Sequence, residues 1–370
     1  MKIERVELHQ IELPLVHPFR TSMGEESEQS CILVAVYSEG LIGWGECSAG
    51  MGPWYSGETL DTAWHILTDF LVPSVIGQDI ESPADHVRLV KKVRGNPMAR
   101  SSIENAMWDL CAKAQGVPLS QMLGGVRDRV EVGVSIGIQP TIDALVARVG
   151  NFVDLGYGRI KCKIEPGWTV EPIARIRNEF PDMRVMADAN SAFTLDDVDM
   201  LKELDSLDLL MIEQPLSYDD IADHARLQTQ VNTPICLDES IHGVADAQAM
   251  IDLNAGSIIN MKVCRVGGLT NALKIHDMSQ EADIAMWSGG MLETGVGRAT
   301  NVHLASLPNF TLPSDISATD RYYHEDIAEP PFVLNREDST MAVPTGAGIG
   351  VTVHMDRIEK ARSRHAVVSA

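Results

Sequence analysis

The chain has 370 residues, of which 45% are hydrophobic and 22% are charged, the balance of a folded protein with one large and one smaller domain. Its 30 basic and 52 acidic side chains give a formal net charge of −22, so no electrostatic affinity for nucleic acid or for anionic membranes is expected. A small anionic carboxylate substrate stays compatible with this charge, because a cation inside a pocket acts locally.

The sequence contains no apolar stretch that approaches the roughly 20 residues of a membrane-spanning helix. Residues 1–7 alternate charged and apolar side chains and lack the apolar centre of a signal peptide. The cysteines are scattered and form no CxxC pair, so we expect reduced thiols and a cytoplasmic protein. The histidines show neither HExxH nor HxH spacing, so the sequence predicts no histidine metal site.

The first 126 residues are predicted to form an α+β unit. Residues 3–50 alternate apolar and polar side chains around a turn at 38–40, which indicates an antiparallel meander. Apolar residues at helical spacing follow over 58–70, 83–93 and 99–114. We expect residues 321–370 to complete this unit, because the pattern of the intervening chain is different.

From about residue 130, short apolar strands alternate with helical segments, which is typical of a parallel sheet built from repeated βα units. Eight strands are predicted, over 130–138, 159–164, 184–189, 209–214, 234–239, 257–263, 284–288 and 310–316. Eight such strands indicate a barrel, which we assign to residues 127–320.

Charged residues recur at intervals of 24 or 25 residues, one for each βα unit: Lys163, Asp188, Glu213, Asp238 and Lys262. If each lies at the C-terminal end of its strand, closure of the barrel brings all of them to one rim, where barrel enzymes carry their active sites. A helix cap or a surface ion pair is the ordinary role of one such carboxylate. Three carboxylates in register instead predict a hard divalent cation, Mg²⁺ with Mn²⁺ as the alternative.

Lys163 and Lys262 are the predicted acid/base residues. Lys161 shares a strand face with Lys163, because side chains alternate along a strand. A lysine near a divalent cation and a second ammonium group is expected to have a lowered pKa, which suits a general base. A solvated surface lysine is the alternative, and it fits poorly with the apolar run over 259–263.

Residues 133–137 match the pattern GxSxG, which leaves a serine hydrolase as one alternative. A nucleophile elbow requires a sharp turn directly into a helix, whereas the strand here is expected to continue through Ile138. Ser135 is therefore interpreted as a polar group on the first barrel strand, facing the same cavity as Lys163.

With these residues, the chain resembles the enolase superfamily, its muconate-lactonizing-enzyme subgroup and, more narrowly, the o-succinylbenzoate synthase/N-succinylamino acid racemase family. The resemblance rests on the stretches IKCKIEPG (160–167), ADAN (187–190), IEQP (212–215), LDES (237–240), NMKVCRVGG (260–268), GGMLETGVGRA (289–299) and LPNFTLPSDISATDRY (307–322). It implies an α/β fold, a (β/α)7β modified TIM barrel with an α+β capping domain built from the N-terminal region and the C-terminal tail.

The resemblance also implies further site residues. A mobile loop over 18–25 would cover the site, and the substrate tail would be lined by Phe19, Met23, Met51, Tyr55, Ser135 and Met291. Lys161, Asn190 and Arg265 would support the metal ligands and the two catalytic lysines. Plain packing of the cap on the barrel is the alternative role of the lining residues.

The implied reaction is Mg²⁺-dependent dehydration of 2-succinyl-6-hydroxy-2,4-cyclohexadiene-1-carboxylate to o-succinylbenzoate through an enediolate, a step of menaquinone biosynthesis. N-Succinylamino acid racemisation is implied as a second activity or as the main role, and a dipeptide epimerase or a cycloisomerase is a further alternative. Outside enzymes, the alternative is a noncatalytic binding barrel, which would be expected to lose one of the recurring charges. A homo-oligomer without nucleic-acid or membrane partners is expected.

Overall fold

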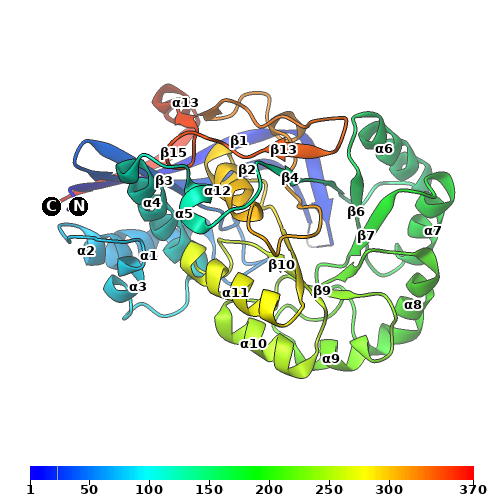
Figure 1. Ribbon diagram of the computed structural model, residues 1–370. Coiled ribbons are helices and arrows are strands. Elements are labelled where there is room, and N and C mark those ends of the chain that lie inside the picture. The colour runs from blue at the N-terminus through cyan, green and yellow to red at the C-terminus, as the bar shows by residue number, and fades with distance from the viewer. Residues whose placement is uncertain (23) are drawn as a thin grey trace.

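A computed structural model of the chain, which describes residues 1–22 and 24–370, contains an antiparallel sheet with its helices beside a parallel-stranded barrel (Figure 1). The antiparallel sheet has the order β15-β1-β2-β3. Its strands are β1 (Arg5–Thr21), β2 (Gly24–Ser38), β3 (Leu41–Cys47) and β15 (Arg362–Ser369). The last strand of the chain therefore pairs with the first, and both termini lie at this end of the molecule (Figure 1).

Helix α4 (Pro97–Gln115) packs closely on β3. A Cβ atom added at Gly43 or at Gly45 would lie 2.0 Å from a carbonyl oxygen of α4, so glycine is what permits this approach. The other helical segments of this unit are α1 (Leu60–Ile66), the π-helical turn η1 (Leu67–Leu71), α2 (Val72–Val75), α3 (Asp85–Leu89) and α5 (Leu119–Leu123). The helix predicted over 83–93 is thus much shorter than its apolar pattern indicated.

Seven barrel strands pair in parallel in the order β11-β10-β9-β8-β7-β6-β5. They are β5 (Val134–Ile136), β6 (Arg159–Lys163), β7 (Arg184–Asp188), β8 (Ile212–Glu213), β9 (Ile235–Leu237), β10 (Ile258–Met261) and β11 (Ala285–Ser288). This parallel sheet confirms the predicted modified TIM barrel.

Helices follow the strands around the outside of the barrel (Figure 1). They are α6 (Ile142–Asp154), α7 (Val170–Glu179), α8 (Val198–Glu203), α9 (Ala222–Gln228), α10 (Val244–Leu253), α11 (Leu269–Glu281) and α12 (Gly295–Ala305). Helix α8 is flanked by two 3-10 turns, η2 (Leu195–Asp197) and η3 (Leu204–Leu207).

The regular eighth strand predicted over 310–316 is wrong for this segment, all of which the structure describes, yet the segment closes the barrel. Phe310 bridges to Met286 of β11, and Ser314 bridges to Val132 beside β4 (Arg129–Glu131). Pro313 lies between the two bridges, and because proline has no N–H group it cannot extend a hydrogen-bonded ladder.

The tail after residue 320 contacts both units. After η4 (Thr319–Arg321), β12 (Ala328–Glu329) pairs with β14 (Thr352–Val353), while β13 (Thr340–Ala342) pairs with β4 beside the barrel. Helix α13 (Met355–Ala361) then leads into β15, which lies in the antiparallel sheet. The tail therefore runs from the barrel back to the sheet that contains the first strand.

The two units share a continuous apolar core. Leu33, Ala35 and Trp44 of the antiparallel sheet belong to the same packed cluster as Val134 and Ile160 of the barrel. All six cysteines are free and buried. Among the described residues, no helix is both long and apolar enough to cross a membrane.

Candidate active site

The recurring charged residues converge at the C-terminal ends of neighbouring strands. Lys163, Asp188 and Glu213 end β6, β7 and β8, while Asp238 and Lys262 directly follow β9 and β10. The parallel register places Lys163 beside Asp188 and Asp188 beside Glu213. All five residues are buried, so their charges interact in surroundings that screen them poorly.

The lysines of β6 contact the carboxylates directly. Lys161 Nζ lies 3.2 Å from both Asp188 Oδ2 and Glu213 Oε2. Lys163 Nζ lies 2.6 Å from Asp188 Oδ2 and donates a hydrogen bond of 2.6 Å to Asn190 Oδ1. Asn190 in turn donates through Nδ2 to Glu239 Oε1 at 2.9 Å. Asn190 therefore links Lys163 to a fourth carboxylate.

Lys262 contacts the carboxylate set from β10. Its Nζ lies 2.9 Å from Asp238 Oδ2 and 4.2 Å from the centre of the Tyr55 ring. The Tyr55 hydroxyl donates to Asp238 Oδ1 at 2.8 Å, and Arg265 pairs with the same oxygen. Arg265 is itself fixed by hydrogen bonds from Nε and Nη2 to the carbonyl oxygens of Ile241 (2.7 Å) and Asn260 (2.6 Å).

Burial and the neighbouring charges shift the pKa values of these groups. Burial, together with the charge of Asp188, raises the pKa of Glu213 to about 7. Burial alone would also raise the pKa of Asp188. The charges of Lys163 and Lys161 outweigh burial and hold this pKa below its usual value. The neighbouring lysines therefore favour the charged form of Asp188, whereas burial favours the protonated form of Glu213.

The acidic groups around Lys262 oppose the lowering of its pKa that a bound cation and a second ammonium group would cause. Burial alone lowers the pKa of this group, but Tyr55, Glu239 and Glu213 outweigh burial and hold it above its usual value. The surrounding acidic groups therefore dominate the electrostatics of Lys262 in the structure.

The residues at this rim fit a hard divalent cation. Asp188, Glu213 and Asp238 supply oxygen only, from adjacent strands, which is the ligand chemistry of Mg²⁺ or Mn²⁺. Glu239 Oε2 is buried without a hydrogen-bond partner beside them. Because an unpaired buried carboxylate oxygen is costly, it indicates unmet demand for positive charge or a donor.

A cavity of about 420 Å³ opens onto the lysines and is lined by both units. It contains Lys161, Lys163, Asn190 and Lys262, together with five residues predicted to contact substrate: Phe19, Met51, Tyr55, Ser135 and Met291. The sixth, Met23, lies outside the described residues. The cavity therefore gathers the predicted lining residues around the two predicted catalytic lysines.

The loop predicted over 18–25 largely continues the β1–β2 hairpin. Arg20 pairs with Glu25, and Thr21 pairs with Gly24. The Arg20 carbonyl accepts a hydrogen bond from the backbone N–H of Ile138, just beyond β5. The hairpin is thereby attached to the barrel beside Ser135.

Several residues around the cavity escaped the sequence analysis. Asp315, on the segment that closes the barrel, lies 3.0 Å from Lys161 Nζ and 3.6 Å from Arg159 Nη1. Asp315 does not continue the interval of 24 or 25 residues, because it lies on the irregular eighth segment. The spacing of charged residues therefore cannot reveal it. Glu239 follows Asp238 directly, a position that strand alternation predicts to face away from the site. The acidic stretch over 25–28 lines the cap side of the cavity. It is visible in the sequence, but its residues were not predicted to contact substrate.

The nucleophile elbow is excluded at Ser135. Strand β5 ends at Ile136 and α6 begins at Ile142, so no sharp strand-to-helix turn follows the serine. Ser135 Oγ is buried without a hydrogen-bond partner, and its residue lines the cavity.

Comparisons with known proteins agree with this geometry. A family described as mandelate racemase / muconate lactonizing enzyme, N-terminal domain, matches residues 5–124, and one described as enolase C-terminal domain-like matches residues 144–357. The chain is 48% identical over 361 residues to an o-succinylbenzoate synthase of Geobacillus stearothermophilus, which covers 97% of this chain and 96% of that protein. It is 46% identical over 360 residues to an N-succinylamino acid racemase of Thermus thermophilus, with 97% of each chain covered. This chain belongs to the o-succinylbenzoate synthase/N-succinylamino acid racemase family of the enolase superfamily.

Solved structures of the enolase superfamily share the fold over the full chain. A Listeria innocua member superposes with a TM-score of 0.96 at 40% identity, covering 100% of this chain and 99% of that chain. A dipeptide epimerase from Cytophaga hutchinsonii, solved with Mg and the dipeptide D-Ala-L-Val, superposes with a TM-score of 0.92 at 26% identity, covering 100% of both chains. This family member is therefore an enzyme with the superfamily architecture.

Proposed function

We propose that this enzyme is a Mg²⁺-dependent o-succinylbenzoate synthase that also racemises N-succinylamino acids at the same site. The observation that carries the proposal is the placement of Lys163 and Lys262 in one cavity, each in contact with a different member of the set Asp188, Glu213 and Asp238. The relatives above, named for these two reactions, support it.

The three carboxylates are the proposed ligands of the cation, with Mn²⁺ as an alternative to Mg²⁺. When bound, the cation supplies electrostatic stabilisation for the negative charge that grows on the substrate carboxylate as the adjacent proton leaves. Lys161 lies within 3.2 Å of Asp188 and Glu213 and holds their side chains toward the rim. The proposed substrate class is a small anionic carboxylate.

For dehydration, neutral Lys163 removes the proton on the carbon next to the substrate carboxylate. Hydrogen bonds of 2.6 Å to Asn190 Oδ1 and Asp188 Oδ2 hold its Nζ in place. When the C–O bond breaks, Lys163 returns this proton to the departing hydroxide, which leaves as water. Lys262, as an ammonium, stabilises the anionic intermediate from its own side.

Racemisation uses the same two lysines in a different way. One lysine removes the proton from one face of the substrate and the other returns a proton to the opposite face, so both residues must exchange protons. The succinyl group common to both substrates would occupy the part of the cavity lined by Phe19, Met51 and Met291. Phe19 and Met291 are half-buried and apolar and would contact the methylene groups of the succinyl chain.

The proposal is tested by measuring kcat/KM for both reactions with one preparation of Mg²⁺-loaded protein. Dehydration of 2-succinyl-6-hydroxy-2,4-cyclohexadiene-1-carboxylate is followed by ultraviolet absorbance, and racemisation of an N-succinylamino acid by optical rotation. We expect the larger kcat/KM for dehydration. A larger value for racemisation would make the racemase the main role, and the absence of both activities would overturn the proposal.

A further inference from the structure

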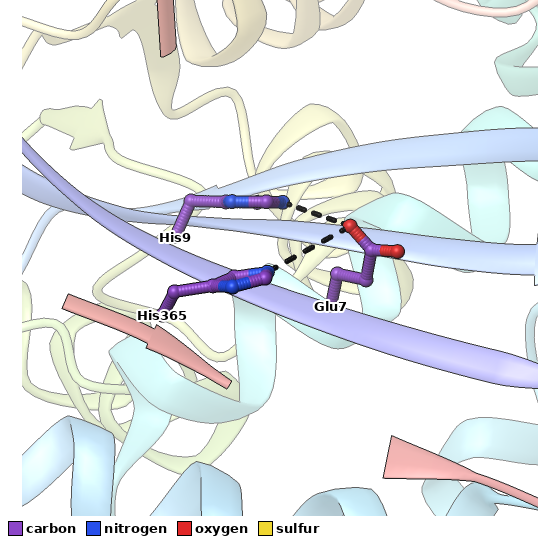
Figure 2. Close-up of side chains that lie close together, drawn as sticks. All are labelled: Glu7, His9 and His365. Atoms are coloured by element: carbon purple, nitrogen blue, oxygen red, sulfur yellow. Dashed lines mark ion pairs between the residues drawn. The ribbon is translucent and has the colours of Figure 1, made fainter. Parts of the chain in front are cut away.

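A cluster of two histidines and a glutamate lies on the antiparallel sheet, away from the residues that line the catalytic cavity. Glu7 and His9 lie two residues apart on β1, and their side chains therefore lie on one face. His365 of β15 is the direct cross-strand partner of His9. Figure 2 shows the two imidazole rings side by side, with both ion pairs meeting at the Glu7 carboxylate.

The potential ligand atoms of this cluster are close together. Nε2 of His9 lies 3.3 Å and Nε2 of His365 lies 3.9 Å from the same oxygen, Glu7 Oε2. The two rings are stacked, with centroids 4.7 Å apart and an interplanar angle of 16°. One ligand atom from each residue lies within 4.8 Å of the other two. Ligand atoms around a tetrahedral ion with bonds of about 2.0–2.1 Å lie roughly 3.3 Å apart, so the three side chains must move closer together and the rings must turn to bind one ion.

His9 lacks the hydrogen bonds that a buried imidazole normally makes. Its side chain is 0% exposed, Nδ1 has no hydrogen-bond partner, and Nε2 has only the 3.3 Å contact with Glu7 Oε2. Burial and the adjacent His365 lower its pKa to about 4, so the ring is neutral at pH 7 and keeps a free lone pair. An unpartnered buried polar group is costly, which calls for an explanation such as an ion.

The charges around the cluster leave one carboxylate oxygen available. Glu7 Oε1 pairs with Arg5 Nε at 3.2 Å, whereas Oε2 faces the two histidines. The His365 side chain is 35% exposed, so water can reach the cluster from that side. Two imidazoles, one carboxylate oxygen and one water together form the donor set of a four-coordinate zinc site.

We propose that Glu7, His9 and His365 bind Zn²⁺ at a second metal site, separate from the carboxylates of the barrel. Imidazole nitrogens favour Zn²⁺ over Mg²⁺, which prefers oxygen ligands. The two sites therefore differ in the ion that they select. A bound Zn²⁺ connects the last strand of the chain to the first and stabilises the folded state, because the unfolded chain does not hold these three ligands together.

The direct test is a calorimetric titration of the full-length protein with Zn²⁺ in excess Mg²⁺, which keeps the barrel carboxylates occupied. We expect one equivalent of Zn²⁺ to bind the wild-type protein and the affinity of His365→Ala to be at least tenfold lower. His242→Ala is the matched control, because His242 is also partly exposed and lies 3.7 Å from a carboxylate, that of Asp246. This control is expected to bind Zn²⁺ like the wild type.

Thermal unfolding supplies a second measurement in the same proteins. Zn²⁺ should raise the Tm of the wild-type protein and of His242→Ala and should slow amide hydrogen exchange in β15, with neither effect in His365→Ala. His365 is partly exposed, so its substitution tests the site even if a His9 variant fails to fold. Wild-type protein that binds no Zn²⁺ in excess Mg²⁺, or an unchanged affinity in His365→Ala, would overturn the proposal.

Discussion

Lys161 lies 3.0 Å from Asp315 and 3.2 Å from Asp188, so one buried ammonium joins the segment that closes the barrel to the proposed metal ligands. Asp315→Asn removes one of the carboxylates that share this ammonium. Lys161 should then pair more strongly with Asp188 and Glu213 and compete with the cation. We expect the Kd for Mg²⁺ to rise by about 10-fold to 100-fold, the usual effect of changing a group that holds metal ligands.

Calorimetry on Asp315→Asn measures this change, and Asp320→Asn, an exposed aspartate nearby, is the control that should match the wild type. An unchanged Mg²⁺ affinity in Asp315→Asn would show that Lys161 does not couple Asp315 to the metal ligands.

Substitution of either proposed catalytic lysine should slow proton transfer strongly. Lys163→Ala and Lys262→Ala are each expected to lower the rate of substrate proton exchange in D2O with Mg²⁺ by on the order of 10²-fold to 10⁴-fold, the usual contribution of a positioned proton-transfer group. NMR of the α-proton measures this exchange. Lys202→Ala, a partly exposed lysine paired with Asp199, should exchange at the wild-type rate. Full exchange in Lys163→Ala or in Lys262→Ala would contradict the acid/base assignment.

The Tyr55 hydroxyl is expected to position Asp238 as well as to line the cavity. Tyr55→Phe keeps the ring beside Lys262 but loses the 2.8 Å hydrogen bond to Asp238 Oδ1. We expect the Kd for Mg²⁺ to rise by about tenfold while the KM for substrate at saturating Mg²⁺ changes little. A raised KM with unchanged Mg²⁺ affinity would instead show that the hydroxyl contacts substrate.

The stability of the protein should depend on pH through Glu46 of β3. Burial and the nearby Glu293 raise the pKa of Glu46 from 4.5 to about 8. The folded state therefore binds a proton that the unfolded state releases above pH 4.5, so this contribution to stability is present below about pH 4.5 and is lost as the pH rises through 8.

Glu46→Gln removes this titration while keeping the shape of the side chain. We expect its free energy of unfolding, relative to that of the wild type, to rise by on the order of 2–4 kcal/mol between pH 5 and pH 8.5. Urea unfolding at both pH values measures the difference. A difference that stays constant with pH would contradict the raised pKa of Glu46.

The alternation of apolar strands with helical segments was sufficient to predict the parallel barrel, and the spacing of the charged residues predicted which of them lie at its rim. One charged residue in each of these βα units lies at the same level of its strand, so Lys163, Asp188 and Glu213 are neighbours in the sheet. In the sequence, the same arrangement appears as a regular interval between charged residues. Such a repeat can be recognised from sequence because strand length and helix length together fix the interval between neighbouring positions.

Contacts between residues that are distant in the sequence and follow no repeat could not be predicted from spacing. Asp315 meets Lys161 only because a non-repeating segment closes the barrel. The pKa of Lys262 depends on Tyr55 and Glu239, which arrive from other elements. His9 and His365 become neighbours only when the last strand pairs with the first, which no local spacing of histidines reveals.

The measurement that tests the account most directly is dehydration of 2-succinyl-6-hydroxy-2,4-cyclohexadiene-1-carboxylate by EDTA-treated protein before and after Mg²⁺ is restored, with Glu213→Gln beside the wild type. We predict no turnover before Mg²⁺ is added, rapid turnover by the wild type afterwards, and little recovery in Glu213→Gln at the same Mg²⁺ concentration. Turnover by the wild type that is unaffected by EDTA, or its absence from folded, Mg²⁺-loaded protein, would contradict the account.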